Sequence, residues 1–205
     1  MCSLGRRHRH AVRAVIALVA LLVPTAVRAD TEWQIRPFVG LTFKGSTTLV
    51  DPEQAAGKVN LALGVGVGLL GEIVGIEGDL SHAPGFFQSG DQELVASSRL
   101  TTLSGNVIVG PSRRATEYSL RPYFVGGFGL IDARIQLTLS ALDIRTTRPA
   151  MNFGGGVTGP LSDRTALSWE LRYFRALGGD AIPGASLAPV ELSFWRANMA
   201  LVIRY

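Results

Sequence analysis

Three residues near the middle of the chain carry groups that are used in nucleophilic catalysis: Asp79, Ser81 and His82. A serine that is activated by a histidine, with an acid to orient the histidine, is a common arrangement for acyl transfer. The surrounding residues alternate as in a β-strand, however, and adjacent strand residues point to opposite faces. Ser81 and His82 therefore cannot readily form a hydrogen-bonded nucleophile–base pair. We predict no catalytic residues and no enzyme activity.

Metal and cofactor sites have no better support. Cys2 is the only cysteine, and His82 is the only histidine after residue 10, so no thiolate or multi-histidine metal site is expected. Glycines recur at residues 64–68 and 126–129, but both runs lie inside expected strands. A phosphate-binding or dinucleotide-binding loop requires a strand–turn–helix context. We predict no cofactor-binding residues, no metal-binding residues and no cofactor.

The first 29 residues have the composition of a secretory signal peptide. Four arginines within residues 6–13 precede an apolar run at residues 14–23, and cleavage is expected after Ala29. The apolar run is shorter than the roughly 20 residues of a membrane-spanning helix, and an uncleaved anchor is the alternative. We therefore divide the chain into a signal peptide at residues 1–29 and one domain at residues 30–205.

Cleavage of this segment changes the charge of the protein. The full chain has 20 Lys and Arg against 16 Asp and Glu, which gives a net charge of +4. Five of the basic residues and none of the acidic ones precede residue 30, so 15 basic and 16 acidic residues remain, with a net charge of −1. The high isoelectric point therefore comes mainly from the targeting segment, and we expect no nucleic-acid partner.

Alternation with a period of two recurs through residues 30–205, in segments of about ten residues. In the clearest segment, residues 58–70, six large aliphatic residues share one face, while Gly64, Gly66 and Gly68 lie on the other. Because glycine weakens a strand, close packing on the small face must require it. Comparable segments lie at about residues 33–44, 72–82, 95–109, 120–130, 151–158, 167–174 and 195–205.

The connections between these eight expected strands differ in length. Those near residues 70–72 and 159–163 are short and that at 111–119 is intermediate, whereas those near 45–57, 83–94, 132–147 and 178–190 are long. With the N-terminus in the periplasm, every long connection falls on the extracellular side, as in membrane β-barrels. The predicted fold class is all-β: a closed antiparallel eight-stranded transmembrane up-and-down β-barrel, preceded by a cleavable signal peptide.

The chain resembles the small eight-stranded outer-membrane β-barrel family of the OmpA/OmpX type over the whole of residues 30–205. The resemblance lies in Leu120-Arg121-Pro122-Tyr123 before Gly126-Gly127-Phe128-Gly129, in Asn152-Phe153-Gly154-Gly155-Gly156-Val157, and in a last strand with Met199, Leu201 and Ile203 before Tyr205. It implies a location in the cell outer membrane. It also implies that the barrel-assembly machinery recognises the C-terminal strand ending in Tyr205. We expect no periplasmic domain after this strand.

A membrane barrel must close its sheet, because strand edges cannot stay unpaired in hydrocarbon. The first strand should therefore pair with the last. The outward face carries candidates for the interfacial aromatic girdles, namely Trp33, Trp169, Tyr173, Trp195 and Tyr205. The inward face carries charges of both signs, namely Arg36, Glu77, Asp79, Arg121, Glu170, Arg172, Arg196 and Arg204. Such charges should pair across a narrow lumen, and we expect no continuous wide pore.

Three functions are compatible with these features. The first is an integral outer-membrane β-barrel with a structural, adhesive or envelope-integrity role, in which the extracellular loops carry any specificity. The second is a narrow channel for ions or small solutes, and the third is a soluble lipocalin-type ligand-binding barrel. The expected partners are outer-membrane lipid, the barrel-assembly machinery and an unknown extracellular ligand. We expect the protein to be a monomer.

Overall fold

The computed structural model describes residues 31–47, 59–86, 95–112, 120–137, 143–178 and 192–205. Eight strands account for nearly all of these residues: β1 (Glu32–Thr47), β2 (Asn60–Leu70), β3 (Val74–Pro84), β4 (Val95–Val109), β5 (Arg121–Leu137), β6 (Asp143–Pro160), β7 (Thr165–Ala176) and β8 (Leu192–Arg204). No helix with the length and hydropathy needed to cross a membrane is found in these ranges. The predicted signal peptide lies outside the described residues and stays a prediction.

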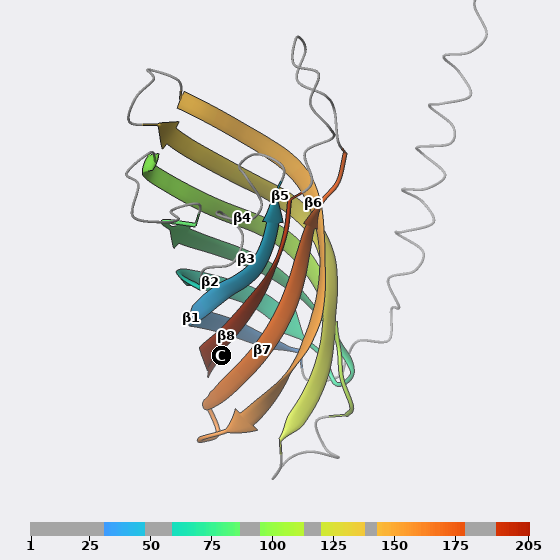
Figure 1. The fold of residues 1–205 in the computed structure, drawn as a ribbon. Coiled ribbons are helices and arrows are strands. Elements are labelled where there is room, and N and C mark those ends of the chain that lie inside the picture. Colours follow the sequence, from blue (N-terminus) through green and yellow to red (C-terminus); the bar gives the residue numbers. More distant parts are fainter. Residues whose placement is uncertain (1–30, 48–58, 87–94, 113–119, 138–142, 179–191) are drawn as a thin grey trace, which may run out of the picture. The chain divides into compact units, whose positions relative to one another are not determined.

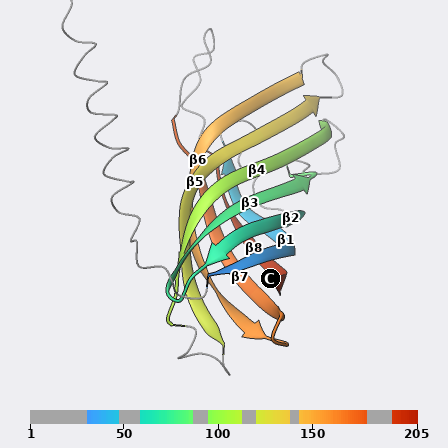
Figure 2. The same ribbon diagram turned by 180° about the vertical axis from the view of Figure 1, so that it is seen from behind.

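The eight strands close into a barrel. Each strand pairs with the next along the chain, and β1 also pairs antiparallel with β8. Figure 1 shows β1 beside β8, and Figure 2 shows the same strands from behind. In the closing pair Gln34 lies opposite Arg204 and Leu41 lies opposite Ala197. The all-β up-and-down barrel is therefore confirmed, and the closure leaves no strand edge that would need hydrogen bonds within hydrocarbon.

The outer face of the barrel is apolar. Exposed large hydrophobic side chains occur on all eight strands, among them Val39, Leu63, Phe124, Phe153 and Met199, and Phe124 is 77% exposed. A water-soluble sheet carries polar residues on its solvated face, and soluble monomers rarely expose apolar patches of this extent. Such a belt matches the lipid-facing band of a transmembrane barrel. It also argues against the soluble lipocalin-type alternative.

Glycines on the inner face let the strands approach the side chains that fill the lumen. A Cβ atom on Gly68 would lie 2.7 Å from the carbonyl oxygen of Ile76, and one on Gly66 would lie 3.3 Å from Oε2 of Glu77. A Cβ atom on Gly64 would collide with the ring of Phe38. The expectation that close packing requires the small face of β2 is thus confirmed.

The ends of the strands differ most from the prediction between β5 and β6. β5 continues to Leu137 and β6 begins at Asp143. The expectation of a long connection over residues 132–147 was therefore wrong. The predicted strands end where the outward face stops being apolar. Beyond that point Ile131 and Ala133 stay buried inside, while Asp132 on the opposite face pairs in register with Thr147. The alternation therefore continues, with polar residues in place of apolar ones on the outside.

The two ends of the barrel are distinguished by their connections. Short turns at residues 71–73 and 161–164 lie at one end, together with the start of β1 and the end of β8. Short turns face the periplasm in barrels of this kind, and longer loops face the exterior. We therefore call this the periplasmic end and the opposite one the extracellular end.

Candidate functional site

Six charged side chains meet inside the barrel and form what we call the lumen charge cluster. They come from β1, β3, β7 and β8, and they are Arg36, Glu77, Asp79, Glu170, Arg172 and Arg196. Three are cationic and three are anionic, so the cluster is neutral as a whole. Because an unpaired charge in such a space would be costly, this balance is the condition for placing ionised groups there.

Arg172 is the centre of the cluster. Its Nη2 donates hydrogen bonds to Oε1 of Glu77 at 2.6 Å and to Oε2 of Glu170 at 2.8 Å. Its Nη1 lies 3.9 Å from Oδ2 of Asp79, and Arg36 forms an ion pair with the other oxygen of Glu77. One guanidinium group from β7 thus contacts carboxylates on both β3 and β7, and it ties the two sides of the lumen together.

Arg196 forms the second part of the cluster. Its Nη2 donates to both carboxylate oxygens of Asp79, at 2.9 Å each, and the residue is 0% exposed. The guanidinium group lies between the rings of Phe38 and Phe174, 4.8 Å from each centroid. The aromatic faces attract the cation, while Asp79 supplies the opposite charge.

Neutral polar groups extend the cluster to the remaining side of the barrel. Asn106 on β4 donates to Oε1 of Glu77 at 3.1 Å, and Asn152 on β6 donates to Oδ1 of Asn106 at 2.9 Å. Tyr123 on β5 donates to Oε2 of Glu170 at 2.9 Å. Every strand except β2 therefore contributes a side chain to one hydrogen-bonded network. At this level β2 contributes Gly66, which leaves room for it.

Apolar layers lie on both sides of the charge cluster. On the periplasmic side are Leu70, Ile108, Tyr123 and Val125. On the extracellular side is a larger group, which we call the aromatic layer, made of Ala62, Ala83, Phe86, Leu100, Ile131, Ala133, Ala150, Phe174, Leu192 and Phe194. In it Phe174 and Phe194 stack with ring centroids 5.0 Å apart, and Phe86 meets Phe194 edge-on at 5.3 Å.

The aromatic layer was not predicted from the sequence. Its signal is present, because the inward residues change from polar to apolar toward the extracellular ends of the strands. Arg172 is followed on the same face by Phe174, and Arg196 is preceded by Phe194.

Side chains fill the lumen at the level of the charge cluster. A cavity at this level has a volume of about 20 Å³ and is bounded in part by Arg36, Tyr123 and Arg172. Such a volume suffices for about one water molecule. The part of the barrel that the structure describes thus contains a charged plug rather than an open passage at this level.

Two of the predicted inward charges lie at the periplasmic rim and not in the cluster. Arg121 donates from Nε to the carbonyl oxygen of Pro111 at 3.1 Å and from Nη2 to that of Glu72 at 2.9 Å. Nε of Arg204 lies 3.2 Å from Oε1 of Glu32. The expected pairing across the lumen is confirmed for the six members of the cluster, whereas Arg121 and Arg204 bind groups near the ends of the strands.

The Asp79, Ser81 and His82 group does not assemble into a catalytic arrangement. Ser81 exchanges a hydrogen bond of 2.7 Å with Thr102 inside the barrel, and Nδ1 of His82 exchanges one of 2.9 Å with Thr101 outside it. The two side chains lie on opposite faces, as the alternation predicted, and Asp79 is engaged with Arg196. No group of three or more His, Cys, Asp or Glu suited to a metal ion occurs among the residues described.

The closed sheet, the polar interior and the apolar belt together define an integral outer-membrane β-barrel of the small eight-stranded class. Comparison with solved structures agrees. Neisserial surface protein A matches 84% of this chain and 97% of its own with a TM-score of 0.63 at 13% identity. The outer membrane protein OprG from Pseudomonas aeruginosa matches 86% and 96%, with a TM-score of 0.54 at 12% identity.

A third solved structure is Ail, the attachment invasion locus protein of Yersinia pestis, in complex with the heparin analogue sucrose octasulfate. It matches 84% of this chain and 99% of its own, with a TM-score of 0.51 at 12% identity. No protein-family model matches the chain, and no curated protein sequence matches it. The chain therefore has the fold of the OmpA/OmpX-type barrels, and the predicted fold and outer-membrane location are confirmed.

Proposed function

We propose that this protein is a closed structural barrel of the outer membrane, without channel or enzyme activity, whose extracellular loops carry any recognition. The observation that carries the proposal is the neutral lumen charge cluster held between two apolar layers. A cluster that pairs all of its charges internally is suited to hold strands together. It leaves no unpaired charge in the cluster to attract a permeating ion.

Conduction would require two separate rearrangements. An ion would have to separate Arg172 from its carboxylates, which would leave buried charges without compensation. It would also have to pass the stacked rings of Phe174 and Phe194, and apolar constrictions oppose the passage of ions. These two barriers in series favour the closed barrel over the alternative of a narrow channel for ions or small solutes.

Conductance in planar bilayers tests the proposal directly. The purified full chain, refolded and reconstituted, should give no discrete conductance steps, while an open porin that is inserted in the same way serves as the positive control. Liposomes that contain the protein should not swell in small sugars. Stepwise conductance or swelling that scales with the amount of folded barrel would contradict the proposal and favour the channel.

Further partners are part of the same proposal. β8 and the aromatic Tyr205, which is 75% exposed, support recognition of the C-terminal strand by the barrel-assembly machinery. We expect the protein to act as a monomer and to bind an unidentified extracellular ligand. The opposite orientation of Ser81 and His82 supports the absence of enzyme activity. Among the solved structures with this fold, Ail is described as an attachment protein, so adhesion is one form of recognition to test.

A further inference from the structure

On the outer face of β3 to β6 the apolar belt ends abruptly toward the extracellular end. Along β4 the successive outward residues are Leu103, Thr101 and Arg99. Leu103 and Arg99 are four positions apart, which is about 13 Å along the strand. The neighbours change in step: Leu103 aligns with Leu80 and Leu130, Thr101 with His82 and Asp132, and Arg99 with Pro84 and Arg134. The surface therefore passes from apolar to polar to basic in three rows.

The basic row consists of arginines at matched positions on three neighbouring strands. Arg99 on β4 lies opposite Arg134 on β5, and Arg134 lies opposite Arg145 on β6. We call these residues the arginine row. Like charges at directly opposite positions of a sheet are destabilising. An anion that lies against such an alignment would therefore stabilise it.

The side chains of Arg134 and Arg99 have donors to spare. Nε of Arg134 lies 3.3 Å from Oδ1 of Asp132, whose other oxygen accepts a hydrogen bond of 2.8 Å from Thr147. This contact holds one edge of the guanidinium group and leaves its two terminal nitrogens for another acceptor. Arg99 is exposed, and it has no carboxylate partner among the residues that the structure describes.

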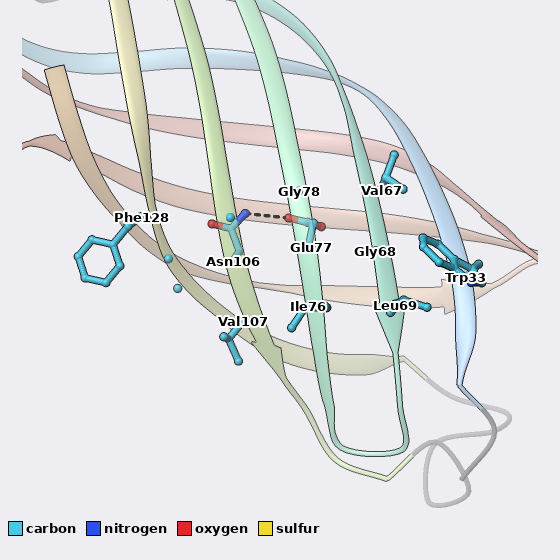
Figure 3. A pocket seen from close by; sticks show the side chains of 13 residues that line it. Trp33, Val67, Gly68, Leu69, Ile76, Glu77, Gly78, Asn106, Val107 and Phe128 are labelled. Atoms are coloured by element: carbon cyan, nitrogen blue, oxygen red, sulfur yellow. Dashed lines mark hydrogen bonds between the residues drawn. The ribbon is translucent and has the colours of Figure 1, made fainter. Parts of the chain in front are cut away.

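An apolar groove lies on the same outer face, closer to the middle of the belt. Gly78 on β3 lies opposite Gly105 on β4, and the groove around them has a volume of about 670 Å³. Apolar side chains border it, and Figure 3 labels Trp33, Val67, Ile76, Val107 and Phe128 among its lining. A Cβ atom on Gly105 would meet no other atom within 4 Å. Internal packing therefore does not demand this glycine, in contrast to those that face the lumen.

The spacing of the row and the groove matches one leaflet of a bilayer. Arg99 and Gly105 are six residues apart on β4, which is about 20 Å along the strand. With the usual strand tilt of about 35–45°, this corresponds to about 15 Å along the membrane normal. Half of the hydrocarbon core is also about 15 Å thick. An acyl chain whose headgroup lies at the arginine row would therefore reach the groove near the mid-plane.

We propose that the arginine row and the groove together bind one phosphorylated lipid of the outer leaflet. Its phosphomonoesters lie against Arg99 and Arg134, and one of its acyl chains occupies the groove at Gly105. Guanidinium groups bind phosphate oxygens in bidentate fashion, and several cations in one row favour a headgroup with more than one phosphate, as in lipid A. This site goes beyond the structural role proposed above and does not depend on whether the lumen conducts.

Lipid binding to the folded full chain in detergent micelles tests the headgroup half of the proposal. Native mass spectrometry would compare bisphosphorylated lipid A with its dephosphorylated form, which has the same acyl chains. We expect the wild type to prefer the phosphorylated form by about tenfold or more, and the double variant Arg99→Gln/Arg134→Gln to lose that preference. Arg164→Gln, which removes an exposed arginine at the periplasmic end, should keep it.

Two further arms separate the lipid from other anions and test the groove. Glucosamine 1-phosphate, which has no acyl chain, should not compete with lipid A at equal concentration. In Gly105→Leu the Cβ atom would meet no other atom within 4 Å, and the rest of the side chain would occupy part of the groove. This variant should weaken the binding of both forms of lipid A by about the same factor. Unchanged preference in Arg99→Gln/Arg134→Gln, effective competition by the sugar phosphate, or full binding by Gly105→Leu would each overturn the proposal.

Discussion

The strongest energetic prediction concerns Asp79 and its partner Arg196. In Asp79→Asn the carboxylate that accepts two hydrogen bonds of 2.9 Å is lost, while Arg196 stays 0% exposed between two phenylalanine rings. The cluster then holds three cations and two anions, and one positive charge is buried without compensation. Removing one member of a buried ion pair typically costs about 3–5 kcal/mol. We expect the free energy of unfolding to fall by that amount.

The double variant Asp79→Asn/Arg196→Met separates the loss of charge balance from the loss of packing. Methionine retains an apolar side chain between Phe38 and Phe174, and the cluster returns to two cations and two anions. Replacing a buried pair by apolar residues is often nearly neutral. The double variant should therefore be more stable than Asp79→Asn alone, with a coupling energy of about 2–3 kcal/mol in the double-mutant cycle.

Equilibrium unfolding in urea provides the measurement, with the barrel folded in lipid vesicles and followed by tryptophan fluorescence and by heat-modifiable gel mobility. Asp163→Asn, an exposed position in the turn after β6, is the matched charge control and should change stability by less than about 0.5 kcal/mol. A cost below about 1 kcal/mol for Asp79→Asn would refute the reasoning. So would a double variant that is no more stable than the single one.

Two other predictions test which residues of the strands point into the lumen and which point outward. Gly127→Ala should lower the free energy of unfolding by about 1–3 kcal/mol, because its Cβ would collide with the Gly105 carbonyl and Asn106. In Gly126→Ala the Cβ would lie 3.7 Å from the nearest backbone atom, and the change should stay within about 0.5 kcal/mol. Urea unfolding measures both, and equal losses would contradict the assigned faces. A fluorophosphonate probe should not label the folded protein, since Ser81 and His82 lie on opposite faces. Intact-mass spectrometry measures the labelling. Labelling of the wild type that is lost in Ser81→Ala would show an activated serine and contradict the prediction.

The alternation of residues was sufficient to predict the barrel because the bilayer reverses the usual meaning of exposure. On β2, Leu61, Leu63 and Val67 are exposed, whereas Ala62 is fully buried. In hydrocarbon the large residues can stay outside, and the small ones fit a narrow lumen. The same reasoning placed Glu77, Asp79 and Arg172 inside. Their ion pairs join residues up to 117 positions apart, and no local pattern could have specified which partners meet.

The extent of β5 and β6 could not be read from the same pattern. A strand that leaves the hydrocarbon faces water on its outer side, and its outward residues then become polar. Asp132 and Arg134 look like loop residues in the sequence, although the strand continues through them to Leu137. The inward residues Ile131 and Ala133 keep the alternation. Scoring the inward face alone would therefore have located these strand ends better than scoring the outward face.

Arginine serves two different purposes in this barrel, and the contrast indicates where binding can occur. Arg172 and Arg196 are buried and bonded to carboxylates of the chain itself, so the lumen satisfies its own charges. Arg99 and Arg134 lie on the outer face in one row, where Asp132 occupies only Nε of Arg134. An interior that is already neutral gives little free energy for binding a ligand, whereas a row of aligned cations gains stability from any anion that reaches it. This contrast supports the proposed binding site on the outer surface of the described barrel at the membrane interface, rather than one in the lumen.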